Sequence, residues 1–190
     1  MKSTWIKNAL IVNEGETYKG SVVISGETIA EVIKGDNLPS TPYNETIDAN
    51  ECYLLPGVID DHVHFRDPGL THKADIHTES MAAAAGGVTS YMDMPNTNPQ
   101  TTTLEALENK FKDAATKSIV NYSFYFGATN NNADLLPLLD KQKVCGVKLF
   151  MGASTGNMLV DRMETLKNIF SNAGMLIATH CEDQNIITAQ

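Results

Sequence analysis

The alternation of apolar and polar residues divides the chain into two parts. In the first part, short apolar stretches lie between turn-forming residues and predict β-strands over residues 5–12, 20–25 and 28–33. A segment rich in Pro, Thr and Asn, residues 37–45, follows them. We therefore expect residues 1–52 to form part of a small all-β domain.

From residue 53 onward, apolar runs that are typical of buried strands alternate with helical patterns. The strand-like runs begin near Val58, Thr89, Val120, Gly146 and Met175. They recur roughly every 30 residues, which is the length of one βα unit, and their repetition predicts a parallel sheet. Helix starts are marked by capping-box spacing, with Thr102 and Asp161 as the expected N-caps.

Five such units fit either an open doubly wound sheet or part of a (β/α)₈ TIM-type barrel. In a barrel, functional residues lie at the C-terminal ends of the strands. The unusual polar residues of this chain follow strand-like runs in that way: residues 60–66, Asn96, Lys148 and His180. No G-x-G-x-x-G follows the first of these strands, so a dinucleotide-binding sheet loses its main support. We predict that residues 53–190 form about five of the eight units of a barrel.

Charge and cysteine content narrow the class of protein. The net charge of −9 argues against nucleic acid or an anionic membrane as a partner. The three cysteines, Cys52, Cys145 and Cys181, show no C-x-x-C spacing, and the pattern indicates reduced thiols. The first residues are polar, and no apolar run approaches the roughly 20 residues needed to cross a bilayer. We expect a cytoplasmic protein.

The stretch GVIDDHVHFRDPG, residues 57–69, carries the first candidate chemistry. Alternate residues of a strand share a face, so Asp60, His62, His64 and Arg66 are expected together. Two imidazoles on one face can bind the same zinc-like ion, and Asp60 is placed to orient one of them by a hydrogen bond. An H-x-H motif alone more often marks two surface histidines, but its position at the end of an apolar strand favours a metal site.

Two later residues could join this metal site. Lys148 lies in GVKLF and points away from its apolar neighbours, so a strand buried on both faces must pair or modify the amine. One modification is uptake of CO₂ to give a carbamate that bridges two metals; the alternative is a lysine that reaches solvent at the strand end. His180 in LIATHCED would supply a third imidazole, or else has a structural role.

Arg66 and Asn96 are candidates for binding an anionic substrate. A guanidinium binds a carboxylate through two parallel hydrogen bonds. The alternatives are a salt bridge of Arg66 with Asp67 or Asp75 and a turn role for Asn96.

Four motifs in order resemble the dihydroorotases of the cyclic amidohydrolase group: PGVIDDHVHFRDPG, AAAAGGVTSYMDMPNTNP, GVKLFMGASTG and ATHCED. The resemblance spans about residues 53–185. It implies that residues 53–190 belong to a metal-dependent hydrolase barrel with two zinc ions. The implied reaction is the reversible hydrolysis of dihydroorotate to N-carbamoyl-L-aspartate in pyrimidine biosynthesis.

The resemblance also implies the roles of individual residues. His62 and His64 would bind the more buried metal, a carboxylated Lys148 would bridge both metals, and His180 would bind the second. Some family members have an aspartate as the bridging ligand. Arg66, Asn96 and His64 would bind the substrate, and Arg66 and Asn96 would hold its carboxylate.

A further metal-binding histidine and the general-base aspartate are implied by the resemblance on later strands. We therefore expect no catalytic residue before Gln190 and an inactive chain when residues 1–190 stand alone. A hydantoinase or allantoinase is an alternative with the same fold and metals. Another is a non-catalytic scaffold for aspartate transcarbamoylase. The expected assemblies are a homodimer or a complex with that enzyme.

Overall fold

The computed structural model describes residues 2–152, 156, 158–182, 186–187 and 189. Parts of two sequence motifs, residues 153–155 and Asp183, lie outside the described residues. Contacts divide the chain into two compact units, residues 1–56 and 57–190. None of the described helices combines the length and the apolar composition that a bilayer crossing requires.

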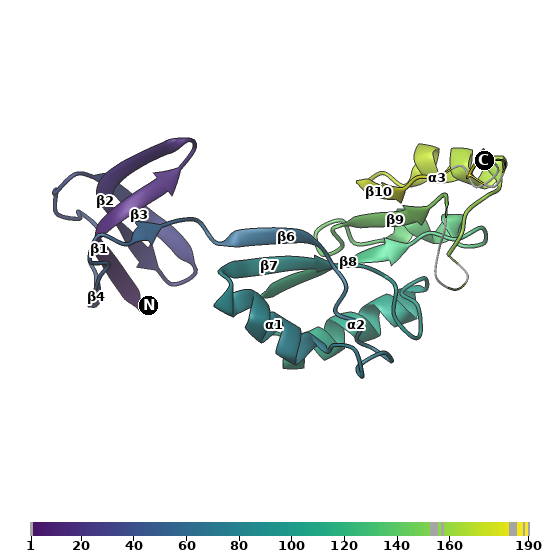
Figure 1. Ribbon diagram of the computed structural model, residues 1–190, viewed down its shortest axis with the longest axis horizontal. Coiled ribbons are helices and arrows are strands. Elements are labelled where there is room, and N and C mark those ends of the chain that lie inside the picture. The colour runs from purple at the N-terminus through teal and green to yellow at the C-terminus, as the bar shows by residue number, and fades with distance from the viewer. Residues whose placement is uncertain (1, 153–155, 157, 183–185, 188, 190) are drawn as a thin grey trace. The chain divides into compact units, whose positions relative to one another are not determined.

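The first unit is a five-stranded β-sheet (Figure 1). Its strands are β1 (Ser3–Asn13), β2 (Glu16–Ser25), β3 (Thr28–Lys34), β4 (Glu45–Asp48) and β5 (Tyr53–Leu54). β1, β2 and β3 are antiparallel neighbours, whereas β4 and β5 both run parallel to β1. The three strands predicted from the apolar pattern are present as β1–β3. The pattern missed β4 and β5 because they have only four and two residues.

The second unit is built around a parallel sheet in the order β10-β9-β8-β7-β6. Its strands are β6 (Val58–Val63), β7 (Val88–Asp93), β8 (Asn121–Gly127), β9 (Gly146–Phe150) and β10 (Ile177–His180). Its helices are α1 (Ile76–Ala85), α2 (Leu104–Lys117), the 3₁₀-helix η1 (Ala133–Leu138) and α3 (Met163–Asn172).

The strand order of this sheet identifies the architecture. Successive strands are neighbours without reversal, whereas a doubly wound sheet reverses its order near the middle. Figure 1 shows α1 and α2 on the same side of β6–β8, as in the outer ring of a barrel. The prediction of part of a TIM-type barrel preceded by a small β unit is confirmed.

The apolar core of the second unit lies between the sheet and its helices. It includes Tyr91, Phe124, Phe126, Val147 and Leu149 from the strands and Ile76, Leu107, Ala114 and Ile169 from the helices. The sheet face turned away from this core is called the inner face below. Its residues are not needed for the helix-facing core and are therefore available for chemistry.

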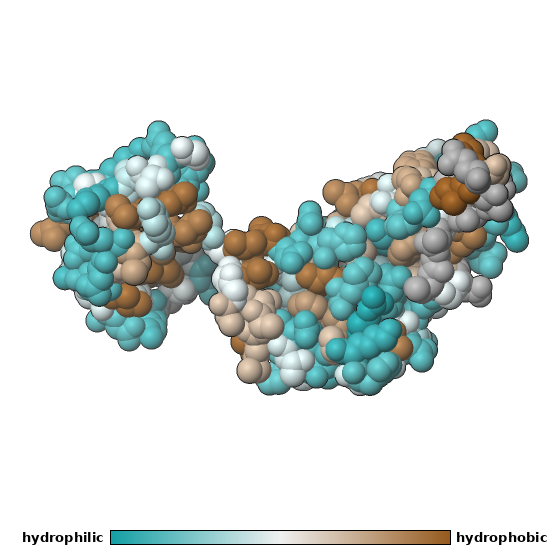
Figure 2. Space-filling model, in the orientation of Figure 1, coloured by the Kyte–Doolittle hydropathy of each residue, from teal (hydrophilic) through white to brown (hydrophobic). Residues whose placement is uncertain are grey.

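Exposed apolar side chains are found on both units (Figure 2). In the second unit, Val58 and Ile59 at the start of β6 are 52% and 61% exposed, and Leu176 before β10 is 60% exposed. β6 and β10 are the edges of the described sheet. These three exposed side chains therefore lie at or next to strands that have a described neighbour on one side alone.

Two expected helix caps are corrected by the structure. The N-cap of α2 is Thr103 rather than Thr102, and the Thr103 hydroxyl accepts the N–H of Ala106 at 3.1 Å. Asp161 does not cap α3, because its carboxylate accepts a 2.9 Å hydrogen bond from the Asn130 amide. A tertiary contact here takes the place of a local capping bond.

Candidate metal and substrate site

Strand register places two of the predicted ligands on the inner face. β9 and β10 pair Lys148 with Ala178 and Phe150 with His180. Paired residues share a face, and every second residue of a strand returns to it. Lys148 and His180 therefore share one face, while Val147 lies in the core on the other.

The imidazole rings of His62, in β6, and His64, just after β6, lie close together. Their centroids are 5.4 Å apart and their planes are inclined by 52°. Two imidazoles at this separation could hold one zinc-like ion if a ring nitrogen of each faced it. The intervening Val63 packs against the apolar core. The pair therefore has the spacing of two ligands to one ion.

Asp60 is placed differently from the expectation that it orients an imidazole. Its carboxylate accepts the backbone N–H of His62 at 3.1 Å. Strand β6 is irregular here, since Asp60 pairs with Tyr91 while Val63 pairs with Asp93. The extra residue of β6 makes a bulge, and Asp60 bonds the main chain within it.

The electrostatic surroundings of His64 link several predicted site residues. Partial desolvation of the ring and the positive charge of Arg66 lower the pKa of His64, and Asp93 opposes this shift. His62 and Lys148 also contribute to the lower pKa. A lowered pKa keeps the imidazole neutral, which is the form that binds metal ions.

Lys148 is the most unusual of the predicted residues. The residue is only 5% exposed, and its ammonium lies 5.1 Å above the Phe150 ring. Within the described residues, no carboxylate forms an ion pair with it. Burial lowers the pKa of the Lys148 amine. A buried amine with a lowered pKa has more of the neutral form that reacts with CO₂, so Lys148 fits the role of a carbamate ligand.

His180 closes β10 on the same face. Its ring centroid is 5.9 Å from that of Phe150, and its Nε2 is 3.4 Å from Glu182 Oε1 without hydrogen-bond geometry. Nε2 is buried and has no hydrogen-bond partner in the described part of the chain. Over the same residues, no three His, Cys, Asp or Glu side chains meet at one point. The structure thus brings His62 and His64 together and places His180 on their sheet without joining it to them.

Arg66 lies just beyond β6 with a left-handed backbone, φ 62°, so the strand alternation does not extend to it. Its Nη1 lies 3.5 Å from the main-chain oxygen of Asn96, whose side chain is buried. The two carboxylates considered as alternative partners are engaged elsewhere. Asp67 pairs with Lys117 at 3.0 Å, and Asp75 caps α1. Neither of these two carboxylates is therefore the partner of the Arg66 guanidinium, which donates to the Asn96 main chain.

Two buried charged residues next to this site were missed by the sequence reasoning. Asp93 ends β7 and Lys110 comes from α2; their side chains are 1% and 0% exposed, and the Lys110 Nζ to Asp93 Oδ2 distance is 2.7 Å. The signal was present in the sequence. Lys110 falls at a core position of the α2 stripe formed by Leu107 and Ala114.

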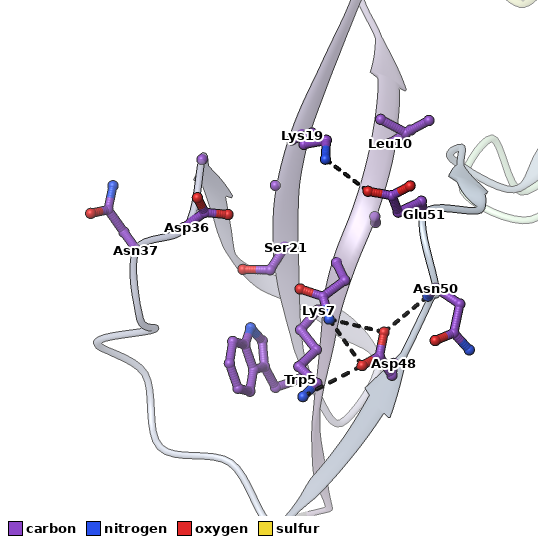
Figure 3. Close-up of a pocket in the computed structure, with 14 residues that line it drawn as sticks. Trp5, Lys7, Leu10, Lys19, Ser21, Asp36, Asn37, Asp48, Asn50 and Glu51 are labelled. Atoms are coloured by element: carbon purple, nitrogen blue, oxygen red, sulfur yellow. Dashed lines mark hydrogen bonds and ion pairs between the residues drawn. The ribbon is translucent and has the colours of Figure 1, made fainter.

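The first unit contains a separate pocket of about 430 Å³ (Figure 3). None of the predicted site residues lines it. Four of its charged side chains form two ion pairs, Lys7 with Asp48 at 3.5 Å and Lys19 with Glu51 at 2.8 Å. The candidate metal ligands all belong to the second unit.

Comparison with known proteins identifies the family. Residues 52–189 match the family model described as Dihydro-orotase-like. An allantoinase from Deinococcus radiodurans is 36% identical over 182 residues, covering 91% of this chain and 39% of the relative. A dihydroorotase from Methanosarcina acetivorans is 34% identical over 189 residues, covering 98% and 40%.

A solved structure gives the same assignment at the level of the fold. L-Hydantoinase (dihydropyrimidinase) from Arthrobacter aurescens superposes with a TM-score of 0.89 at 29% identity, covering 100% of this chain and 43% of the other. The chain thus spans about two fifths of the length of the relatives it matches. With its partial barrel and the family match over residues 52–189, the chain belongs to the dihydroorotase-like family of the cyclic amidohydrolases.

Proposed function

We propose that this protein acts as a zinc-dependent dihydroorotase in the cytoplasm, where it interconverts dihydroorotate and N-carbamoyl-L-aspartate for pyrimidine biosynthesis. The observation that carries the proposal is the pairing of the His62 and His64 rings, 5.4 Å apart, beside Arg66. The buried Lys148, which has no carboxylate partner among the described residues, adds a potential bridging ligand near them. Such potential metal ligands are what a metal-dependent hydrolase needs, and membership of the dihydroorotase-like family supports a hydrolase as well.

The proposed ligand set uses four residues. His62 and His64 would bind one zinc ion, His180 the second, and a carboxylated Lys148 both. Zinc supplies a Lewis acid that polarises the cyclic amide carbonyl and lowers the pKa of bound water. The lowered pKa of His64 favours its ligand form at neutral pH. The Nε2 of His180 is buried and accepts or donates no hydrogen bond among the described residues, which is in keeping with a role as a ligand.

Substrate recognition is assigned to Arg66 and Asn96. The Arg66 guanidinium would bind the ring carboxylate of dihydroorotate through two hydrogen bonds. Its Nη1 lies 3.5 Å from the Asn96 main chain, at the outer limit of a hydrogen bond, so little binding is lost when the substrate takes its place. His64, whose ring feels the charge of Arg66, would border the bound ring as well as bind the metal.

A hydantoinase or allantoinase activity is the second candidate. The Deinococcus radiodurans relative is an allantoinase, and the structural relative from Arthrobacter aurescens is an L-hydantoinase. Those enzyme classes act on cyclic amides without the carboxylate that Arg66 would bind. The two proposals therefore differ in what Arg66 does.

Kinetics of the protein expressed from its native gene with zinc will separate the candidates. Hydrolysis of dihydroorotate, hydantoin and allantoin is measured for the wild type, for Arg66→Ala and for Arg162→Ala. Loss of hydrogen bonds to a charged group costs about 1.5–3 kcal/mol. We expect Arg66→Ala to reduce kcat/KM for dihydroorotate by about 10- to 150-fold, with little effect on hydantoin. The exposed Arg162 is the matched control and should change neither.

Other outcomes select an alternative. A wild type that hydrolyses hydantoin or allantoin but not dihydroorotate would exclude the first proposal. A folded protein without zinc and without hydrolysis would favour a scaffold for aspartate transcarbamoylase. Size-exclusion chromatography with and without that enzyme tests the proposed homodimer and complex.

A further inference from the structure

The Asp93–Lys110 ion pair connects the core to the segment that carries His64. The Asp93 carboxylate uses Oδ2 for Lys110, at 2.7 Å, and Oδ1 to accept the N–H of Phe65, at 2.9 Å. Phe65 lies between His64 and Arg66 in sequence. At this point β6 has ended, so a side chain rather than a strand neighbour satisfies the Phe65 N–H.

The lysine of the pair makes a matching contact with the next strand end. Lys110 Nζ donates to the main-chain oxygen of Met94 at 3.0 Å. Met94 follows β7 and precedes Asn96 by two residues. The Lys110 ammonium also lies 4.8 Å from the centroid of the Phe124 ring. The ion pair thus hydrogen-bonds the main chain at Phe65, next to His64 and Arg66, and at Met94, close to Asn96.

Stability alone does not account for this pair. Buried ion pairs are often no more stabilising than apolar side chains of the same volume, because both charges must leave water. Burial lowers the pKa of the Lys110 amine, and the Asp93 carboxylate opposes this shift. The pair makes two hydrogen bonds to the main chain, from the Phe65 N–H to Asp93 Oδ1 and from Lys110 Nζ to the Met94 oxygen, and an apolar pair could make neither.

We propose that Asp93 and Lys110 are positioning residues, which fix the main chain at Phe65 and Met94 so that His64 and Arg66 on one side and Asn96 on the other keep the geometry of the site. The inference rests on the proposed function for its effect on zinc. Asp93 acts through the Phe65 N–H, and Lys110 acts through the Met94 oxygen and by holding the carboxylate. Neither side chain binds the metal or the substrate.

The test compares two double variants that both avoid leaving a buried charge alone. Asp93→Asn/Lys110→Met keeps an oxygen that can accept the Phe65 N–H, whereas Asp93→Ala/Lys110→Met removes it. Lys112→Met is the control on the same helix, because Lys112 is exposed. If the alanine variant does not fold, Asp93→Leu/Lys110→Met, which also lacks an acceptor but fills the space, takes its place.

Two readouts are made on the protein expressed from its native gene, for variants whose circular dichroism matches the wild type. The first is hydrogen exchange at the Phe65 amide without metal, and the second is zinc affinity by competition with a chelator. We expect the alanine variant to exchange faster at Phe65 and to bind zinc about 10-fold or more weakly, as for residues that orient metal ligands. The asparagine variant should recover most of both properties.

Positioning by the pair is overturned if the alanine variant, once folded, shows wild-type exchange at Phe65 and wild-type zinc affinity. It is also overturned if the asparagine variant is as impaired as the alanine variant, because the effect would then come from general loosening of the core. The proposed function is judged separately with His62→Ala/His64→Ala. If that variant retains as much zinc as the wild type, the metal site is wrong, and Phe65 exchange alone decides the role of Asp93.

Discussion

Replacing Lys148 by methionine should have opposite effects on stability with and without zinc. Methionine has a similar length and volume, so the exchange keeps most of the packing and removes the amine. In the metal-free protein this amine is buried and has no carboxylate partner among the described residues. With zinc, the same nitrogen is proposed to carry a carbamate that holds both ions.

The expected change in the free energy of unfolding is the cost of burying the Lys148 amine less what its contact with Phe150 contributes. Burying a polar group without a hydrogen-bond partner costs about 1–3 kcal/mol in proteins. The contact with Phe150, at 5.1 Å, offsets about 0.5–1 kcal/mol of this cost. We therefore expect Lys148→Met to stabilise the metal-free protein by about 1–2 kcal/mol. With zinc at 100 times its Kd, the wild type gains about 2.7 kcal/mol per ion, and the variant loses much of this gain.

Urea denaturation followed by circular dichroism measures both effects, in a chelator and in zinc with bicarbonate. The pH dependence of the free energy of unfolding gives a second test of the same reasoning. Because the Lys148 pKa is lowered in the folded state, the unfolded chain binds more protons between the folded pKa and 10.5. The stability of the metal-free wild type should therefore rise with pH across that window, and Lys148→Met should remove this contribution.

The reasoning about Lys148 is refuted if the variant is less stable than the wild type in the chelator, since the amine would then have a stabilising partner. It is equally refuted if zinc stabilises the variant as much as the wild type. Lys143→Met, at an exposed position of the segment before β9, is the control and should not show the change of sign.

Two further predictions concern buried groups elsewhere in the second unit. Lys110→Met leaves the Asp93 carboxylate buried without its 2.7 Å partner and should reduce the free energy of unfolding by about 3–5 kcal/mol. In the same urea titration, Lys112→Met should be close to the wild type. A loss of less than about 1 kcal/mol for Lys110→Met would contradict the buried pair. Burial raises the pKa of the Cys145 thiol to about 11. At pH 8 the thiolate fraction of Cys145 is about 100-fold below that of a thiol with a pKa of 9. Iodoacetamide should therefore label the exposed Cys52 and Cys181 first, which mass spectrometry can show. Equal labelling of all three cysteines would contradict the burial of Cys145.

Much of the barrel could be predicted from periodicity because each βα unit repeats one physical pattern. The strand-like runs of the sequence coincide with β6–β10, and among these strands β9 is buried at every position. The short strands β4 and β5 were not predicted, because they have too few buried residues to produce an apolar pattern in the sequence. The start of α3 was misplaced because Asp161 bonds Asn130, which lies 31 residues away in the sequence.

In the candidate site too, features set by neighbouring residues could be predicted from the sequence, whereas features set by distant contacts could not. The spacing of His62 and His64 was enough to predict that their rings lie close together, since only local geometry is involved. The contact made by Asp60 was not predictable in this way, because the bulge in β6 depends on its register with β7. The partnership of Asp93 with Lys110 likewise needs the packing of α2 against the sheet, although a lysine at a core position was a visible signal.

The proposed function depends on two zinc ions held by His62, His64, Lys148 and His180. The most direct measurement is a crystal structure of the protein expressed from its native gene, grown with zinc and bicarbonate, with anomalous data on both sides of the zinc edge. The account predicts two anomalous peaks on the inner face, one within about 2.0–2.2 Å of both His62 and His64, and continuous density for a carbamate on Lys148 between them. Zinc bound elsewhere, or an unmodified Lys148 with no metal beside the two histidines, would contradict it.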